Sequence, residues 1–151
     1  MEIRPARPQD AAALYDICLR TGDHGQDATG QYTDPRLLGE VYVGPYLALA
    51  PDLAFVLADA DDLPAGYVLG VADTARFETW CATDWWPPLR ERYPLDTARP
   101  GTPDADVIRL IHAPPVADPD LTARFPAHLH VDLLPAAQGG GNARRLLETL
   151  P

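Results

Sequence analysis

The order of apolar and polar positions along the chain predicts short strands and helices in alternation. A short strand at Ile3–Ala6 precedes a helix that begins at Pro8, in which apolar residues recur on one face. A second helix runs from Asp34 to about Val43, where Gly44-Pro45 interrupts it. The chain therefore begins with a strand and two helices.

The segment between these two helices, Thr21–Thr33, carries glycines among polar residues. Loops of this length without secondary structure of their own are usually functional. We therefore expect this segment to be an ordered loop that lines a site.

The middle of the chain contains two apolar runs with a polar turn between them. Leu53–Ala58 and Gly66–Ala72 have the length and composition of strands, which predicts a hairpin of two central strands. The further elements that we expect are helices at Thr74–Ala82 and Trp85–Arg92, a turn-rich segment at Pro94–Pro103, a strand at Val107–His112 and a helical turn at Leu121–Phe125.

The end of the chain combines a strand, a glycine-rich turn and a helix. The strand begins at His128 and leads through Pro135 into the turn, and a helix is expected at Gly140–Leu150. Because glycine lacks a Cβ, consecutive backbone N–H groups can converge on one point, and the first turn of a helix adds unpaired N–H groups. The turn therefore predicts a cradle for a pyrophosphate. A plain glycine-rich turn before an amphipathic helix is the alternative.

Two other phosphate-binding loops do not fit this turn. The loop of nucleoside triphosphatases needs a lysine, and the chain contains none. The dinucleotide-binding motif needs a glycine where Arg144 stands, and an acidic residue about twenty positions later, beyond Pro151.

The length of 151 residues predicts a single domain, residues 1–151. No apolar run approaches the roughly eighteen residues of a membrane span, and the N-terminus does not resemble a signal peptide. We therefore expect a cytoplasmic protein without a membrane partner. Cys18 and Cys81 lie far apart in expected helices, which predicts free buried thiols and no metal site.

The net charge of −10 bears on the partners of the protein. Phosphate backbones are bound by clustered basic residues, so we expect no nucleic-acid partner. A negative field favours a cationic substrate, such as an amine.

The glycine-rich turn follows the pattern Gln/Arg-x-x-Gly-x-Gly/Ala at Gln138, Gly141 and Ala143. This pattern resembles the acetyl-CoA loop of the GCN5-related N-acetyltransferases (GNAT family). A further series of matches is similar to bacterial relatives of the acetyltransferase-like C-terminal domain of O-GlcNAcase, and it spans most of the chain. These matches are Phe55-Val56-Leu57, Gly66-Tyr67-Val68-Leu69-Gly70, Trp85-Trp86-Pro87 and Phe125-Pro126.

This resemblance implies an α/β (α+β) fold of the GNAT type, with a mixed, mostly antiparallel central sheet flanked by helices, and acetyl-CoA as cofactor. Main-chain groups of Leu133 and Leu134 would pair with the pantetheine arm. The pyrophosphate would lie against the turn, which consists of Gln138, Gly139, Gly140, Gly141, Asn142, Ala143 and Arg144. Gly140 and Asn142 depart from the family pattern, which favours a basic and an aliphatic residue at these two positions.

Alternation along the last strand puts His128, His130 and Asp132 on one face. Imidazole has an ordinary pKa near about 6.5, which suits a base at neutral pH, and an adjacent carboxylate can fix its tautomer. We expect His130 or His128 to accept the proton of an amine, and Asp132 to orient that histidine. In the alternative interpretation, the three side chains only satisfy one another or face solvent.

Members of the family continue beyond the cofactor helix, whereas this chain stops at Pro151. We therefore expect the C-terminal strands of the fold to be missing, either through truncation or because a homodimer or another completing chain supplies them. Two hypotheses follow. The first is an N-acetyltransferase that acts on a primary amine of a small molecule or a protein. The second is a non-catalytic module of the same fold that serves binding or assembly.

Overall fold

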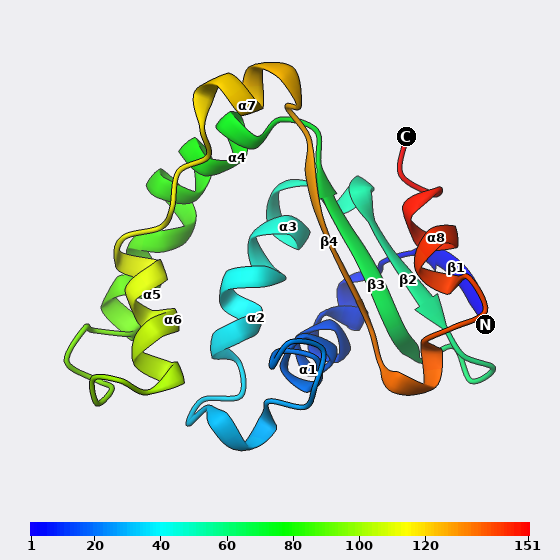
Figure 1. Cartoon of the computed structure of the whole chain (residues 1–151), viewed down its shortest axis with the longest axis horizontal. Coiled ribbons are helices and arrows are strands. Elements are labelled where there is room, and N and C mark those ends of the chain that lie inside the picture. The colour runs from blue at the N-terminus through cyan, green and yellow to red at the C-terminus, as the bar shows by residue number, and fades with distance from the viewer.

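The chain folds around one antiparallel sheet, which a computed structural model describes together with all of residues 1–151 (Figure 1). The strands are β1 (Glu2–Pro5), β2 (Ala54–Ala58), β3 (Pro64–Val71) and β4 (His128–Leu133), hydrogen-bonded in the order β1-β2-β3-β4. β2 and β3 form the expected hairpin, and β4 lies at one edge of the sheet, antiparallel to β3. The expected fold class, an antiparallel sheet flanked by helices, is confirmed.

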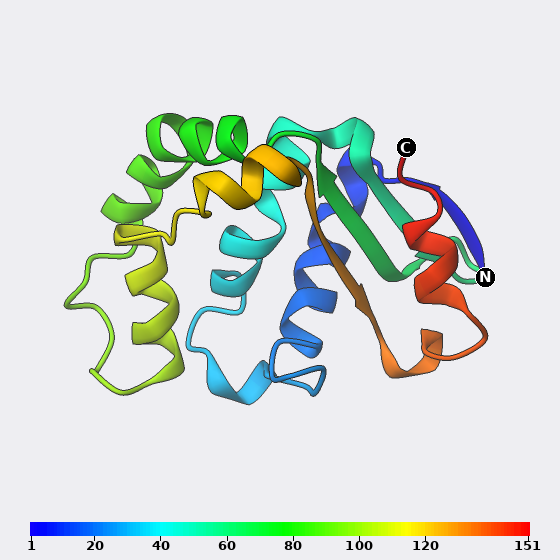
Figure 2. The same ribbon diagram turned by 45° about the horizontal axis from the view of Figure 1, so that its top comes forward.

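Helices cover both faces of this sheet. They are α1 (Ala11–Arg20), α2 (Leu37–Tyr42), α3 (Gly44–Leu49), α4 (Thr74–Trp80), α5 (Trp86–Arg92), α6 (Pro103–His112), α7 (Pro119–Arg124) and α8 (Asn142–Leu147). Short 3-10 turns occupy Pro8–Asp10, Thr29–Gln31, Pro51–Leu53 and Pro135–Ala137, and a π-helical turn at Cys81–Trp85 joins α4 to α5. In Figures 1 and 2, α1 to α3 lie on one face of the sheet, α8 lies on the other, and α4 to α7 form a further layer beyond α2.

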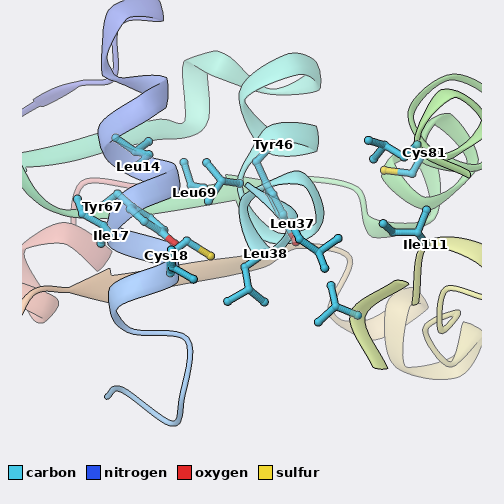
Figure 3. Close-up of a cluster of buried hydrophobic side chains, with 14 of the residues drawn as sticks. Leu14, Ile17, Cys18, Leu37, Leu38, Tyr46, Tyr67, Leu69, Cys81 and Ile111 are labelled. Atoms are coloured by element: carbon cyan, nitrogen blue, oxygen red, sulfur yellow. The ribbon is translucent and has the colours of Figure 1, made fainter. Parts of the chain in front are cut away.

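The main core fills the space between the sheet and helices α1 to α3. Leu14 of α1 belongs to the same buried cluster as Tyr67 and Leu69 of β3, and all three side chains are fully buried (Figure 3). Successive strand residues point to opposite faces. Val68 therefore lies on the other face, in a second cluster with Leu146 of α8. This alternation explains why β3 is apolar along nearly its whole length.

Two cysteines belong to the main core. Cys18 and Cys81 are free and buried, as predicted. Burial raises the pKa of each thiol to about 12. Both side chains therefore remain protonated at neutral pH and act as apolar packing groups.

The segment Val107–His112 is the second half of α6, so the prediction of a strand there is wrong. Helix α6 starts after Thr102, whose side chain accepts a hydrogen bond from the Ala105 N–H and so caps the helix. This cap lies in the segment that we interpreted as turn-rich. A short β-branched run fits a strand or a helix equally well by its periodicity, and the packing of α6 on α2 and α5 selects the helix.

Candidate active site

β4 directs its polar and apolar side chains to opposite faces of the sheet, as the alternation predicts. The rings of His128 and His130 lie on the face of the sheet that α1 to α3 cover. Their centroids are 5.5 and 5.2 Å from the centroid of the Tyr46 ring in α3. Val131 packs on the opposite face, against the cluster that contains Leu146 of α8. β4 therefore presents a row of polar side chains, which we call the polar row, on the face of the sheet that packs against α1 to α3.

Both ring nitrogens of His128 are hydrogen-bonded. Nδ1 lies 2.7 Å from Thr74 Oγ1, and Nε2 lies 2.8 Å from the Tyr46 hydroxyl oxygen. The Thr74 hydroxyl has a single proton, which it donates to the Pro126 carbonyl at 2.8 Å. Nδ1 must therefore carry a proton and donate it to Thr74, while Nε2 accepts from Tyr46. Burial, followed by the neighbouring His130, lowers the pKa of His128, which favours this neutral form.

His130, two residues further along β4, has no hydrogen bond to either ring nitrogen. Its half-buried ring packs at an angle to the rings of Tyr42 and Tyr46, 5.6 and 5.2 Å away between centroids. No fully buried side-chain nitrogen or oxygen lacks a partner, so the free nitrogens of His130 reach open space. Burial lowers the pKa of His130, and the Asp132 charge raises it in part. At neutral pH, His130 therefore offers an uncharged, unpaired imidazole, which is what a general base requires.

Asp132 is held by a neighbour on β3. Its carboxylate accepts a hydrogen bond of 2.5 Å from the Tyr67 hydroxyl, and burial raises the pKa of Tyr67 far above its usual range. No hydrogen bond joins Asp132 to His130. The carboxylate therefore acts on His130 through its charge, and an orienting role for Asp132 stays a prediction.

Two adjoining cavities of about 290 and 470 Å³ open beside the histidines. They have in common the side chains of Tyr46, Glu78, Pro115, Val116, His128 and His130. We call this hollow, bounded by α3, α4 and the segment that joins α6 to α7, the apolar cleft. Most of its lining is aliphatic, aromatic or proline, and its size is in the range of small-molecule sites.

A third cavity of about 240 Å³ adjoins His130 and Asp132. It lies beside the loop that follows α1, since Thr21, Gly22 and Tyr32 also line it. Both ends of this loop therefore line a cavity next to His130, and the expected role of the loop in a site stays a prediction.

The outer edge of β4 carries free backbone groups. The Leu134 N–H donates to the Ala65 carbonyl, and the Leu134 carbonyl accepts from the Ala137 N–H. Alternate residues of an antiparallel strand point toward the partner strand, so the N–H groups of Val131 and Leu133 point away from β3. Of the two residues that we expected to offer main-chain groups to a ligand, Leu133 has a free outward N–H, whereas both groups of Leu134 are occupied.

The glycine turn has an unusual backbone. The φ angles are 83° at Gly139, 59° at Gly140 and 77° at Gly141, a region that residues with a Cβ rarely adopt. No atom lies within 4 Å of a Cβ built on any of the three, so the space beside them is open. Five backbone N–H groups have no acceptor within the chain, namely those of Gly139, Gly140, Gly141, Ala143 and Arg144. A ligand with several anionic acceptor oxygens fits such a turn at a helix start.

Side chains hold this turn in place. Asn142 Nδ2 donates to the Ala137 carbonyl at 2.9 Å, and Gln138 Nε2 donates to the outward Leu133 carbonyl at 3.1 Å. Helix α8 follows directly and ends at Leu147, so it is shorter than expected. Arg144 is exposed and pairs with Glu148 across one helical turn. Asn142, which departs from the family pattern, is therefore a structural residue here.

Sequence reasoning missed three residues of this site. Tyr46 and Thr74 bind His128, and Glu78 lines the apolar cleft. Tyr46 lies in an apolar run and the other two in an ordinary helix, so none of them carries a local signal. Only their approach to β4 in the folded chain reveals them.

The structure contains neither a metal-binding cluster nor a helix that could span a membrane. No group of three His, Cys, Asp or Glu side chains could hold a metal ion. None of the helices combines the length and the apolar character that a crossing of the bilayer requires.

Comparison with known proteins gives two kinds of relative, while no family model matches the chain. It is 34% identical over 133 residues to the Protein O-GlcNAcase of Rattus norvegicus and to that of Mus musculus. These alignments cover 87% of this chain and 14% of each O-GlcNAcase, so the chain spans a small part of the curated relatives it matches.

The crystal structure of SsHAT matches with a TM-score of 0.89 at 44% sequence identity, and the match covers 98% of this chain and 73% of that one. The agreement in fold and sequence thus extends over nearly the whole chain. The chain therefore belongs to the GNAT family, in the group of GNAT-like domains that includes SsHAT and the C-terminal region of O-GlcNAcase.

Proposed function

We propose that this chain binds acetyl-CoA and transfers the acetyl group to a primary amine, of a small molecule or of a protein lysine, by direct attack of the amine. The observation that carries this proposal is the glycine turn, where five free N–H groups adjoin the open edge of β4. Membership of the GNAT family supports acetyl-CoA over other phosphate-containing ligands.

The cofactor would be held mainly by backbone. The N–H groups of Gly139–Gly141, Ala143 and Arg144 would bind its diphosphate, because a glycine turn at a helix start favours anions. The outward N–H groups of Val131 and Leu133 would pair with the pantetheine arm as an added strand pairs with a sheet edge, while the Leu133 carbonyl is held by Gln138. Bound acetyl-CoA supplies an activated acyl group. Gln138 supports this site by fixing the turn to β4.

His130 is the proton acceptor in this proposal, since its imidazole is uncharged at neutral pH and unpaired. His128 is less suited, because both of its nitrogens are already hydrogen-bonded. It instead positions the Tyr46 hydroxyl at the wall of the cleft. The negative charge of Asp132 stabilises the imidazolium that forms when His130 takes up a proton.

Calorimetric titration with acetyl-CoA tests the turn. Gly141→Glu places a carboxylate beside the diphosphate, and we expect affinity to fall about five- to thirtyfold, on the order of 1–2 kcal/mol after solvent screening. Gly141→Asn is the matched control, because asparagine tolerates a positive φ without adding charge. Gly30→Glu adds the same charge at an exposed position away from the turn. Unchanged affinity in Gly141→Glu would mean that the turn does not bind the cofactor.

The alternative is a non-catalytic module of the same fold. It is favoured by the O-GlcNAcase alignments, in which the matching segment is a small part of a much larger protein. Release of free thiol from acetyl-CoA, measured over a panel of amines, separates the two hypotheses. An enzyme releases thiol and loses this activity in His130→Gln, whereas a module binds acetyl-CoA without amine-dependent release.

A further inference from the structure

The apolar cleft contains a single carboxylate. Among the residues that line its two cavities, Glu78 is the only acidic one, and no arginine is present. The remaining polar side chains are the two histidines, four residues with hydroxyls, one cysteine and Trp86 with its indole N–H. A cationic ligand group that enters this cleft therefore has one anionic partner there.

Glu78 is held in place with one oxygen unused. Its Oε1 accepts a hydrogen bond of 2.8 Å from the Ala117 N–H, which fixes the carboxylate between α4 and the segment before α7. Oε2 has no hydrogen-bond partner in the chain, and it is accessible because no fully buried polar side-chain atom is unpaired. The negative charge also adds to burial in raising the pKa of Cys81, and it opposes the lowering of the pKa of His128. The carboxylate thus acts on both walls of the cleft.

The mouth of the cleft is apolar as well. Val116, Leu121 and Phe125 line the larger cavity and are 79%, 55% and 61% exposed. Exposed apolar side chains that gather around a hollow mark a site for an apolar ligand. Inside, the aromatic rings of Tyr46 and Phe77 continue this surface toward His130.

We infer that the apolar cleft binds the acceptor substrate, and that this acceptor is a monoamine with an apolar body of aromatic size, whose ammonium group pairs with Glu78 Oε2. The inference rests on the proposed function for its last step, in which His130 takes the proton. The ammonium N–H bond would break, the proton would pass to the free imidazole nitrogen, and the amine would keep the electron pair that forms the new N–C bond to the acetyl carbon. The C–S bond would break as the thiolate leaves, and the thiolate would take up the second proton that the amine nitrogen releases. Glu78 is then a binding residue and His130 the base.

The single carboxylate excludes a polycation, and the apolar walls disfavour a polar amine. A second ammonium group would enter the cleft without an acidic partner, and burial of an unpaired charge is strongly unfavourable. A hydroxylated amine would lose hydrogen bonds to water along walls that offer few replacements.

The test measures binding and transfer separately. Binding of 2-phenylethylamine, 2-phenylethanol, ethanolamine, spermidine and a lysine-containing peptide is followed by NMR titration of the complete chain, and thiol release is measured with acetyl-CoA. We expect 2-phenylethylamine to bind at least tenfold more tightly than 2-phenylethanol. Glu78→Gln keeps an acceptor for the Ala117 N–H and should remove that preference. Glu91→Gln, an exposed carboxylate of α5, is the matched control and should leave it unchanged.

Phe125→Ala provides a second variant that does not disturb the core, because this side chain is 61% exposed. This variant should weaken the binding of 2-phenylethylamine and of 2-phenylethanol by the same factor. Tighter binding of ethanolamine, spermidine or the peptide than of 2-phenylethylamine would overturn the inference, and so would a preference for the amine that persists in Glu78→Gln. If 2-phenylethylamine binds as expected and no amine causes release of thiol, the assignment of the cleft as an amine-binding site stands and the proposed acetyltransferase function is refuted.

Discussion

Replacing Tyr46 by phenylalanine tests the hydrogen-bond arrangement at His128. The wild-type chain of bonds runs from the Tyr46 hydroxyl to His128 Nε2, and from Nδ1–H through the Thr74 hydroxyl to the Pro126 carbonyl. Tyr46→Phe removes one donor and leaves one acceptor, Nε2, without a partner. Because His128 lines the cleft, water can replace the lost donor.

The expected destabilisation follows from these partners. Loss of one hydrogen bond to a neutral group costs about 1 kcal/mol, which corresponds to about 2–4 °C in melting temperature for a chain of this size. Thr74→Val should cost about twice as much. The Thr74 hydroxyl makes two hydrogen bonds, to the Pro126 carbonyl and with His128 Nδ1, and the residue is only 7% exposed. The variant loses both bonds and leaves Nδ1 without a partner, while the Pro126 carbonyl keeps the Thr74 backbone N–H.

Chemical denaturation measures both variants, and long-range 15N–1H correlation spectra of the histidine rings report the tautomer. We expect a protonated Nδ1 and a bare Nε2 at His128 in the wild-type protein. A protonated Nε2 with a bare Nδ1 would refute the derivation. Equal destabilisation by Tyr46→Phe and Thr74→Val would contradict the assigned roles of the two hydroxyls.

Three more predictions concern acidity and packing. The kcat/KM of acetyl transfer should fall at acidic pH with its midpoint below 6.5, the ordinary value of a histidine, because burial lowers the pKa of His130 and the base must be unprotonated. Asp132→Asn removes the charge that raises this pKa and should move the midpoint to lower pH, whereas a midpoint above 6.5 argues against His130. Asp10→Asn should lower the free energy of unfolding by about 1.5–3 kcal/mol at pH 7, because the hydrogen bond from Arg4 lowers the pKa of Asp10 in the folded chain. The stabilisation by Asp10 is present above its unfolded pKa of 3.8 and is lost as the pH falls through its folded pKa. Urea denaturation should therefore give a smaller difference between variant and wild type near pH 3, and an equal difference at both pH values would rule out the ionised pair. Gly39→Ala should destabilise the protein by about 1–3 kcal/mol, because the added Cβ would clash with the Tyr15 ring. In Gly30→Ala the added Cβ has no atom within 4 Å, so this variant should be nearly as stable as the wild type. Similar melting temperatures for the two variants would refute the packing argument.

Features that depend on neighbours in sequence could be predicted from the sequence. The glycine turn lies between a strand and a helix as expected, and the strand directs His128 and His130 to one face, because alternation is a property of the extended backbone itself. The helix α6 is the instructive failure. Its apolar run is too short to distinguish a strand from a helix, and its packing partners decided the outcome.

The sequence by itself determined the family, the fold class and the polar row on β4, since these follow from local periodicity and from a motif of contiguous residues. Only the tertiary structure distinguished the two histidines. The hydrogen-bond partners of His128 come from positions 82 and 54 residues away in the chain. His130 has no such partner, and its ring lines cavities instead. Glu78 joined the site in the same way, through the approach of α4 to β4. Such contacts depend on how distant helices pack around one strand, and no pattern within a single segment contains that information.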